Sequence, residues 1–199
     1  MIGNDIIDLA AVRERSPRHW ECYRAKVMTI SEQKTLACRR LHLRQTGRSK
    51  SSELLTQHPE NNLDIWFAWA VKESVYKLEF QMDQERYFAP KQIQILEFDP
   101  INQQGRAQGK LATYPFEIHF IEGFIHALVW SPERSKPSYQ HLHLDALPLD
   151  QHLEEILKKQ FPNQQLHYKR WPFPQFIIDH ETTIPVSMSH HGRWGAFAF

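Results

Sequence analysis

The sequence predicts an α+β protein made of two α+β halves, each with a small antiparallel sheet packed on helices. Residues 64–80 form a clear helical pattern, and residues 89–130 turn to strand-like alternation. A similar mixture of strand and helix patterns starts again after a stretch rich in proline and serine at 131–140. We therefore expect halves at 1–133 and 141–199 with a linker at 131–140. A chain of 199 residues is long enough for one domain or for two small halves that share a core.

The first half begins with a short strand. Residues 1–9 alternate so that Gly3 and Asp5 lie on one face and Asn4 and Ile6 on the other. A charged helical pattern covers 19–43.

That helical pattern is interrupted near 29–31, where Ser31 is the expected N-cap of a second helix. The polar residues 44–62 predict a loop.

Strand patterns dominate the rest of the first half and recur in the second. The first set covers 91–98, 110–114, 116–122 and 124–130, with a turn expected over 102–109. The second half predicts a helix over 150–161, and the strand patterns around it cover 141–145, 165–169, 176–179 and the C-terminal segment 185–199.

The net charge of +1 conceals an uneven distribution. Residues 1–50 carry a charge of +6 and the remainder carries −5. The basic stretch at 13–50 could attract an acidic partner or could be a solvated helix face. The chain as a whole is not basic enough to predict nucleic acid as its ligand.

Composition excludes several classes of protein. No apolar run is long enough to cross a membrane, and the acids Asp5 and Asp8 stand where a signal peptide would need basic and then apolar residues. Two cysteines sixteen positions apart do not form a disulfide framework, which favours the cytoplasm. The seven glycines form no phosphate-binding loop, so side chains would have to hold any phosphate.

The helix over 64–80 carries the strongest chemical signal. Trp66, Trp69, Glu73 and Lys77 fall along one stripe of it. A Glu–Lys pair four residues apart is often only a surface ion pair. However, Asp5 is an acid in an otherwise apolar strand, which is costly to bury unless it is paired or binds a metal. Two carboxylates beside a lysine suit Mg²⁺ that also contacts phosphate oxygens.

The C-terminal segment supplies a second group. Strand alternation places Ser187, Ser189 and His191 on one face and His190 on the other, and Gly192 ends the strand. A serine and a histidine beside a glycine turn could hold phosphate oxygens. A single histidine on a strand is more often structural.

Together, these segments resemble a known family. Segments 3–9 (GNDIIDL), 69–77 (WAVKESVYK) and 186–194 (VSMSHHGRW) are similar to the three signature blocks of the 4′-phosphopantetheinyl transferase superfamily: G-x-D, W-x-x-K-E-S/A-x-x-K and hydrophobic-S-x-S-H. The middle block is the most specific, and the set is stronger than any one block. Segments 29–36 and 124–132 match less distinctive parts of the family pattern.

The order of these blocks differs from that in the larger, surfactin-type members. There the half that carries S-x-S-H comes first and runs into the G-x-D strand, whereas here residues 1–133 resemble the second half. The resemblance thus implies the 4′-phosphopantetheinyl transferase fold with two pseudo-symmetric halves in permuted order. The small holo-acyl-carrier-protein synthases also place G-x-D first, usually as trimers. Because one chain here carries both halves, we expect a monomer.

The resemblance implies a transferase that moves 4′-phosphopantetheine from coenzyme A to a serine of an acyl or peptidyl carrier protein and releases 3′,5′-ADP. It implies Mg²⁺, with Mn²⁺ as the alternative, bound by Asp5, Glu73 and Asp8. Surfactin-type members commonly carry an acid at the position of Ile7, and the next acid here is Asp8, at the spacing seen in the holo-acyl-carrier-protein synthases. Glu73 would accept the serine proton, and Lys77 would contact the phosphates.

The remaining expected contacts to coenzyme A come from the second half. The resemblance assigns Ser189 and His190 to its phosphates, with Lys169 or Arg170 as further contacts. Carrier proteins of this kind are acidic, so the basic stretch at 13–50 is their expected docking surface.

Two other functions stay open. One is a protein of the same fold that binds coenzyme A or a carrier without catalysis. The other is a zinc protein that uses His141 with His143 or His190 with His191, although neither pair has the spacing of a structural zinc site.

Overall fold

The computed structural model describes residues 1–12, 17–35, 62–144, 149–160, 162, 166–169, 174–178 and 182–199. Its helices and antiparallel sheets confirm the α+β class. The helices with defined bounds are α1 (Leu9–Val12), α2 (Pro17–Val27), α5 (Leu63–Asp83) and α6 (Leu149–Gln160). The strands are β1 (Ile2–Asp8), β2 (Gln94–Asp99), β3 (Gln104–Gln108), β4 (Thr113–Ile121), β5 (Phe124–Trp130), β6 (Tyr139–His143), β7 (Leu166–Lys169), β8 (Gln175–Ile178), β9 (Thr182–Pro185), β10 (Ser187–His191) and β11 (Trp194–Ala198).

The strands form three antiparallel sheets. A five-stranded sheet in the order β1-β5-β4-β3-β2 uses residues before the expected linker. Two three-stranded sheets, β10-β11-β6 and β7-β8-β9, use residues after position 138. Strand β6 starts at Tyr139, so the extended structure begins two residues earlier than the predicted strand at 141.

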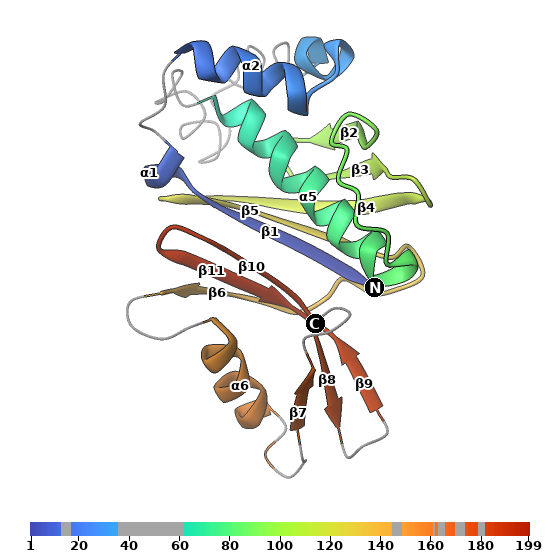
Figure 1. Ribbon diagram of the computed structural model, residues 1–199, viewed down its shortest axis with the longest axis vertical. Helices are drawn as coiled ribbons and strands as arrows, with labels where there is room; N and C mark the ends of the chain where they lie inside the picture. The colour runs from blue at the N-terminus through green and yellow to red at the C-terminus, as the bar shows by residue number, and fades with distance from the viewer. Residues whose placement is uncertain are drawn as a thin grey trace.

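The sheets and helices lie in layers (Figure 1). Helix α5 covers one face of the five-stranded sheet, the β10-β11-β6 sheet covers the other, and α6 lies against the outer face of that smaller sheet. Strand β1 therefore contacts α5 on one side and β10 and β11 on the other. Because β1 is also an edge strand, its free edge lies where the two layers meet.

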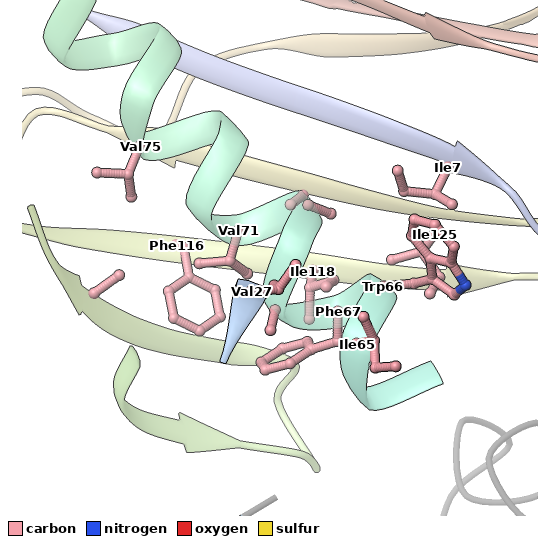
Figure 2. Packing of buried hydrophobic residues seen from close by; sticks show 14 of the residues in the cluster. Ile7, Val27, Ile65, Trp66, Phe67, Val71, Val75, Phe116, Ile118 and Ile125 are labelled. Carbon is pink, nitrogen blue, oxygen red and sulfur yellow. The ribbon is translucent and has the colours of Figure 1, made fainter. Parts of the chain in front are cut away.

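The main hydrophobic core lies between α5 and the five-stranded sheet (Figure 2). Burial of large aliphatic and aromatic side chains here is the principal stabilising term of the fold. The helix contributes Ile65, Trp66, Phe67, Val71 and Val75, and the strands contribute Ile7, Phe116, Ile118 and Ile125.

Helix α5 confirms the helix predicted over 64–80 and is slightly longer at both ends. Its buried lysine, Lys72, donates hydrogen bonds of 2.8 Å to the carbonyl of Val27 and to Glu32. Glu32 in turn accepts from the backbone N–H groups of Thr29 and Ile95. This pair therefore ties α5 to the chain after α2 and to β2.

The predicted N-cap at Ser31 was wrong. Helix α2 ends at Val27 and helical structure resumes at position 30, so the cap is Thr29. The Thr29 hydroxyl accepts from the Glu32 N–H at 3.2 Å, while the Glu32 carboxylate accepts from the Thr29 N–H at 2.8 Å. This reciprocal capping box satisfies two donors at the helix start, which Ser31 could not do from inside the helix.

Two strand predictions need correction. The turn expected over 102–109 is largely strand β3, which pairs with β2 and β4 although its sequence does not alternate. The strands predicted at 110–114 and 116–122 are one strand, β4, that runs through Pro115. Proline is tolerated there because β5 pairs with β4 only from Phe116 onward.

Candidate active site at the free edge of strand β1

Side chains from both layers satisfy the backbone along the free edge of β1. On the α5 side, Gln81 bonds both backbone groups of Ile2, at 3.2 and 2.8 Å, and Lys77 donates to the carbonyl of Asn4 at 3.1 Å.

Strand β10 binds the same edge from the other layer. There the Ser187 hydroxyl accepts from the N–H of Asn4 at 2.8 Å, and His191 Nδ1 accepts from the N–H of Asp8 at 3.1 Å. The edge thus joins the helix that carries Glu73 to the strand that carries the Ser–His segment.

Gly3 allows the helix to approach this strand. A Cβ atom at Gly3 would lie 1.8 Å from the carbonyl oxygen of Ser74, a distance that no side chain can occupy. Gly3 and Asp5 lie on the face of β1 toward α5, as the alternation predicted, while Asn4 faces β10. The glycine of the G-x-D segment therefore lets α5 come close enough to contact the acid two residues later.

The structure brings Lys77 of α5 to Asp5 of β1, with Glu73 on the same helix. Lys77 Nζ lies 2.9 Å from Asp5 Oδ1. The second oxygen of Asp5, Oδ2, is buried and has no hydrogen-bond partner. Glu73 is half-buried one turn before Lys77 and forms no hydrogen bond with the described residues. Lys77 pairs with Asp5 and acts on Glu73 only through its charge, so both acids retain unused oxygen ligands.

Electrostatics at the pair differ from those of ordinary surface acids. Burial raises the pKa of Asp5, and the positive charge of Lys77 only partly offsets this. Burial also raises the pKa of Glu73; Lys77 opposes the shift and the neighbouring Asp5 adds to it. A cation placed between the two carboxylates would relieve both the burial and the mutual repulsion. The unpartnered Asp5 oxygen and the oxygen-only donor set therefore fit Mg²⁺.

Asp8 has a different set of partners. Its Oδ1 accepts from the N–H groups of Ala10 and Ala11 at the start of α1, and Oδ2 accepts from the N–H of Arg193 at 3.0 Å. Burial would raise the pKa of Asp8, but these backbone hydrogen bonds outweigh it and lower the pKa. Asp8 thus anchors α1 and the β10–β11 turn to β1.

No cluster of three or more His, Cys, Asp or Glu side chains able to hold a metal occurs among the described residues. The predicted trio of Asp5, Glu73 and Asp8 is therefore not assembled as a single group. The metal-binding prediction rests on Asp5 and Glu73 alone.

Ser189 and His190 of β10 point to opposite sides, as the alternation predicted. Ser189 is buried and donates its hydroxyl hydrogen to Asn4 Oδ1. His190 is exposed on the other face. His191, which the family resemblance did not single out, is the histidine that reaches the edge of β1. The period-two alternation was the sequence signal that placed it on the face with Ser187 and Ser189.

The other predicted ligands are not joined to this group. Lys169 is exposed at the end of β7 and forms no hydrogen bond or ion pair with Asp5, Glu73 or Lys77. Arg170 lies outside the described residues, as does much of the basic stretch at 13–50. Within the described part of that stretch, Arg24 pairs with Asp64, and Lys26 and Lys34 are exposed.

A cluster of histidines lies elsewhere, between the two facing sheets. His126 of β5 is completely buried, and its Nδ1 lies 2.9 Å from His141 Nε2 of β6. The ring of His119 of β4 stacks on His126 with centroids 5.9 Å apart. Burial lowers the pKa of all three, that of His141 to about 4. His141 is thus engaged in a neutral packed cluster instead of pairing with His143 for zinc.

Comparison with known proteins adds no assignment: the sequence matches no protein-family model and no curated protein. In the described ranges, no helix has the length and apolar character to span a membrane.

Proposed function

We propose that this protein is a 4′-phosphopantetheinyl transferase with its two halves in permuted order. It would transfer phosphopantetheine from coenzyme A to a serine hydroxyl of an acyl or peptidyl carrier protein in the cytoplasm. The observation that carries the proposal is the Asp5–Lys77 ion pair, which leaves a buried oxygen of Asp5 unpartnered and lies within electrostatic range of Glu73. Phosphoryl transfer from a pyrophosphate needs such an arrangement of acids and a cation.

The permuted order is supported by the positions of the chain ends. Met1 accepts a hydrogen bond from the N–H of Ser131, and Phe199 exchanges two hydrogen bonds with Ser138. Both ends therefore lie against the segment 131–138 that joins the sheets. Termini that lie near each other make an exchange of the two halves sterically simple.

The two acids and the lysine each have a chemical role in this proposal. Asp5 and Glu73 would hold Mg²⁺, which neutralises charge on the pyrophosphate when bound. Lys77 has three donors and uses two, on Asn4 and Asp5, so one is available to a phosphate oxygen. Its positive charge would stabilise the charge that develops on the departing 3′,5′-ADP.

Glu73 would act as the general base. It takes the proton from the carrier serine as the serine oxygen bonds to the phosphorus next to pantetheine, and the bond from that phosphorus to the bridging oxygen of the pyrophosphate breaks. The pKa of Glu73 is raised by burial, which makes its carboxylate a better proton acceptor near neutral pH than an exposed glutamate.

The second half would bind coenzyme A from the other side of β1. Exposed His190 is free to contact a phosphate, whereas Ser189 must release Asn4 before it can donate to one. Because β10 reaches β1 within a single chain, we propose that the enzyme works as a monomer. Lys26 and Lys34 are the described basic residues that an acidic carrier would meet.

A transfer assay tests the proposal. Purified protein, Mg²⁺ and coenzyme A are incubated with a panel of apo-carrier proteins, and mass spectrometry follows the carriers. We expect a mass increase equal to one phosphopantetheine group. Glu73→Gln should abolish it with the fold intact by circular dichroism. Asp83→Asn, a change at the exposed end of the same helix, is the matched control and should retain transfer.

The outcomes separate the enzyme from the non-catalytic alternative. If no carrier gains mass although the folded protein binds coenzyme A in calorimetry, the transferase proposal is wrong and the protein is a binding protein. A Glu73→Gln variant that still transfers would show that another group takes the serine proton.

A further inference from the structure

We propose that His191 donates a hydrogen bond from its Nε2–H to the pyrophosphate of the ligand bound at the free edge of β1, opposite Lys77. This inference rests on the proposed function, because it assumes a ligand with a pyrophosphate at that edge. It adds a phosphate-binding residue to the two already proposed, Ser189 and His190.

The position of His191 follows from the packing of its turn. Gly192, at a φ of 55°, lies so close to Asp8 that a Cβ atom there would be 2.3 Å from Asp8 Oδ2. The next residue, Arg193, donates its backbone N–H to the same oxygen at 3.0 Å. The end of β10 is therefore clamped to the end of β1, which holds the His191 ring against the strand edge.

The hydrogen-bond partner of His191 determines which ring nitrogen is the donor. Nδ1 accepts from the backbone N–H of Asp8 at 3.1 Å. A neutral imidazole that accepts at Nδ1 carries its hydrogen on Nε2. No described residue accepts from Nε2, and the side chain is only half-buried. The structure thus presents a fixed N–H donor that no described residue uses.

The same strand edge carries both this donor and Lys77. The N–H of Asp8 and the carbonyl of Asn4 belong to one short strand, and Lys77 binds the second while His191 binds the first. The His191 ring also lies within electrostatic range of Asp5. An anion that extends from Lys77 toward His191 would accept hydrogen bonds from both, one from helix α5 and one from strand β10.

Two substitutions separate binding from positioning. His191→Gln places an amide donor near the position of Nε2, whereas His191→Asn keeps an acceptor near Nδ1 for the Asp8 N–H but has no donor farther out. Calorimetry with Mg²⁺ measures the affinity of each variant for coenzyme A and for dephospho-coenzyme A. A lost hydrogen bond to a charged phosphate predicts roughly 10- to 100-fold weaker binding for His191→Asn.

We expect the loss in His191→Asn to be equal for the two probes, and His191→Gln to bind within about threefold of the unsubstituted protein. A loss confined to coenzyme A would place His191 on the 3′-phosphate and overturn the assignment. Wild-type affinity in His191→Asn would reduce His191 to a structural partner of Asp8. If no carrier is modified but the probes bind, the affinities still decide the role of His191, so failure of the transferase proposal is separate.

Discussion

Helix α5 contributes the lysines of two lysine–carboxylate pairs, which differ in how fully their carboxylate oxygens are hydrogen-bonded. Lys72 is fully buried with Glu32: its ammonium reaches two acceptors, and both Glu32 oxygens accept hydrogen bonds from backbone N–H groups. Lys77 is partly exposed, and its partner Asp5 keeps one buried oxygen without a hydrogen bond.

The difference separates a structural polar group from a site. A buried charge that finds all its partners within the chain stabilises one arrangement of elements. A buried oxygen without a partner is costly unless something outside the chain supplies the missing interaction. We infer that Lys72 and Glu32 hold the fold, whereas under the proposed function Asp5, Glu73 and Lys77 would bind a cation and phosphates.

The largest expected effect on stability comes from breaking the Lys72–Glu32 pair. Lys72→Met leaves the buried Glu32 carboxylate without its cation and should lower the free energy of unfolding by about 3–5 kcal/mol. Urea denaturation followed by tryptophan fluorescence measures the loss. The matched variant Lys77→Met should cost only about 1 kcal/mol, because Lys77 is partly exposed. Equal losses would remove the distinction between the two pairs.

The histidine cluster tests a third arrangement, in which burial keeps titratable groups neutral. The lowered pKa values of His126, His141 and His119 mean that the unfolded chain binds protons first as the pH falls below about 6.5. Stability should therefore be complete near pH 7.5 and decline toward pH 4, by about 2 kcal/mol at pH 5 for each histidine that stays neutral.

A double variant checks this pH dependence. Replacement of both His126 and His141 by phenylalanine removes the hydrogen-bonded pair together and should flatten the decline in unfolding free energy between pH 7.5 and pH 5. His152→Gln, on helix α6, is the control and should leave the pH profile unchanged. A profile that is the same in all three proteins would mean that other groups cause the loss.

The smallest expected effect on stability concerns the Asp5–Lys77 pair. Because the pKa of Asp5 is raised, its charged form is disfavoured by the fold, and this penalty is fully present above the raised pKa and fades as the pH falls toward 3.8. Asp5→Asn should therefore raise stability at pH 7 by about 1 kcal/mol without metal, equivalent to about 2–4 °C in Tm.

Sufficient Mg²⁺ should make the unsubstituted protein more stable than the Asp5→Asn variant. A cation that binds Asp5 and Glu73 stabilises the folded unsubstituted protein by mass action, so its Tm should rise with Mg²⁺ concentration while that of Asp5→Asn stays constant. Thermal unfolding at several Mg²⁺ concentrations provides the measurement. An equal response from both proteins would place the cation elsewhere.

Local patterns in the sequence predicted much of the fold and part of the site. The period of 3.6 residues identified α5, and the period of two placed Gly3 and Asp5 on one face of β1, which the structure turns toward that helix. Polarity alone missed β3, because that strand is held by two neighbours and not by an alternating pattern. The sequence pattern also predicted the wrong helix cap, Ser31. The actual cap is Thr29, because the Glu32 side chain reaches back to bond its backbone N–H.

The sequence by itself determined the class of fold and the chemistry at hand: an acid two residues after a glycine, and a Glu–Lys pair on one helical stripe. Only the tertiary structure decided which lysine of α5 is buried with its acid, and that His191 meets β1 while His190 faces away. The physical reason is the separation along the chain of the residues that interact. Periodicity reports on neighbours within one element, whereas the bond from Asn4 to Ser187 joins residues 183 positions apart and depends on how whole layers pack.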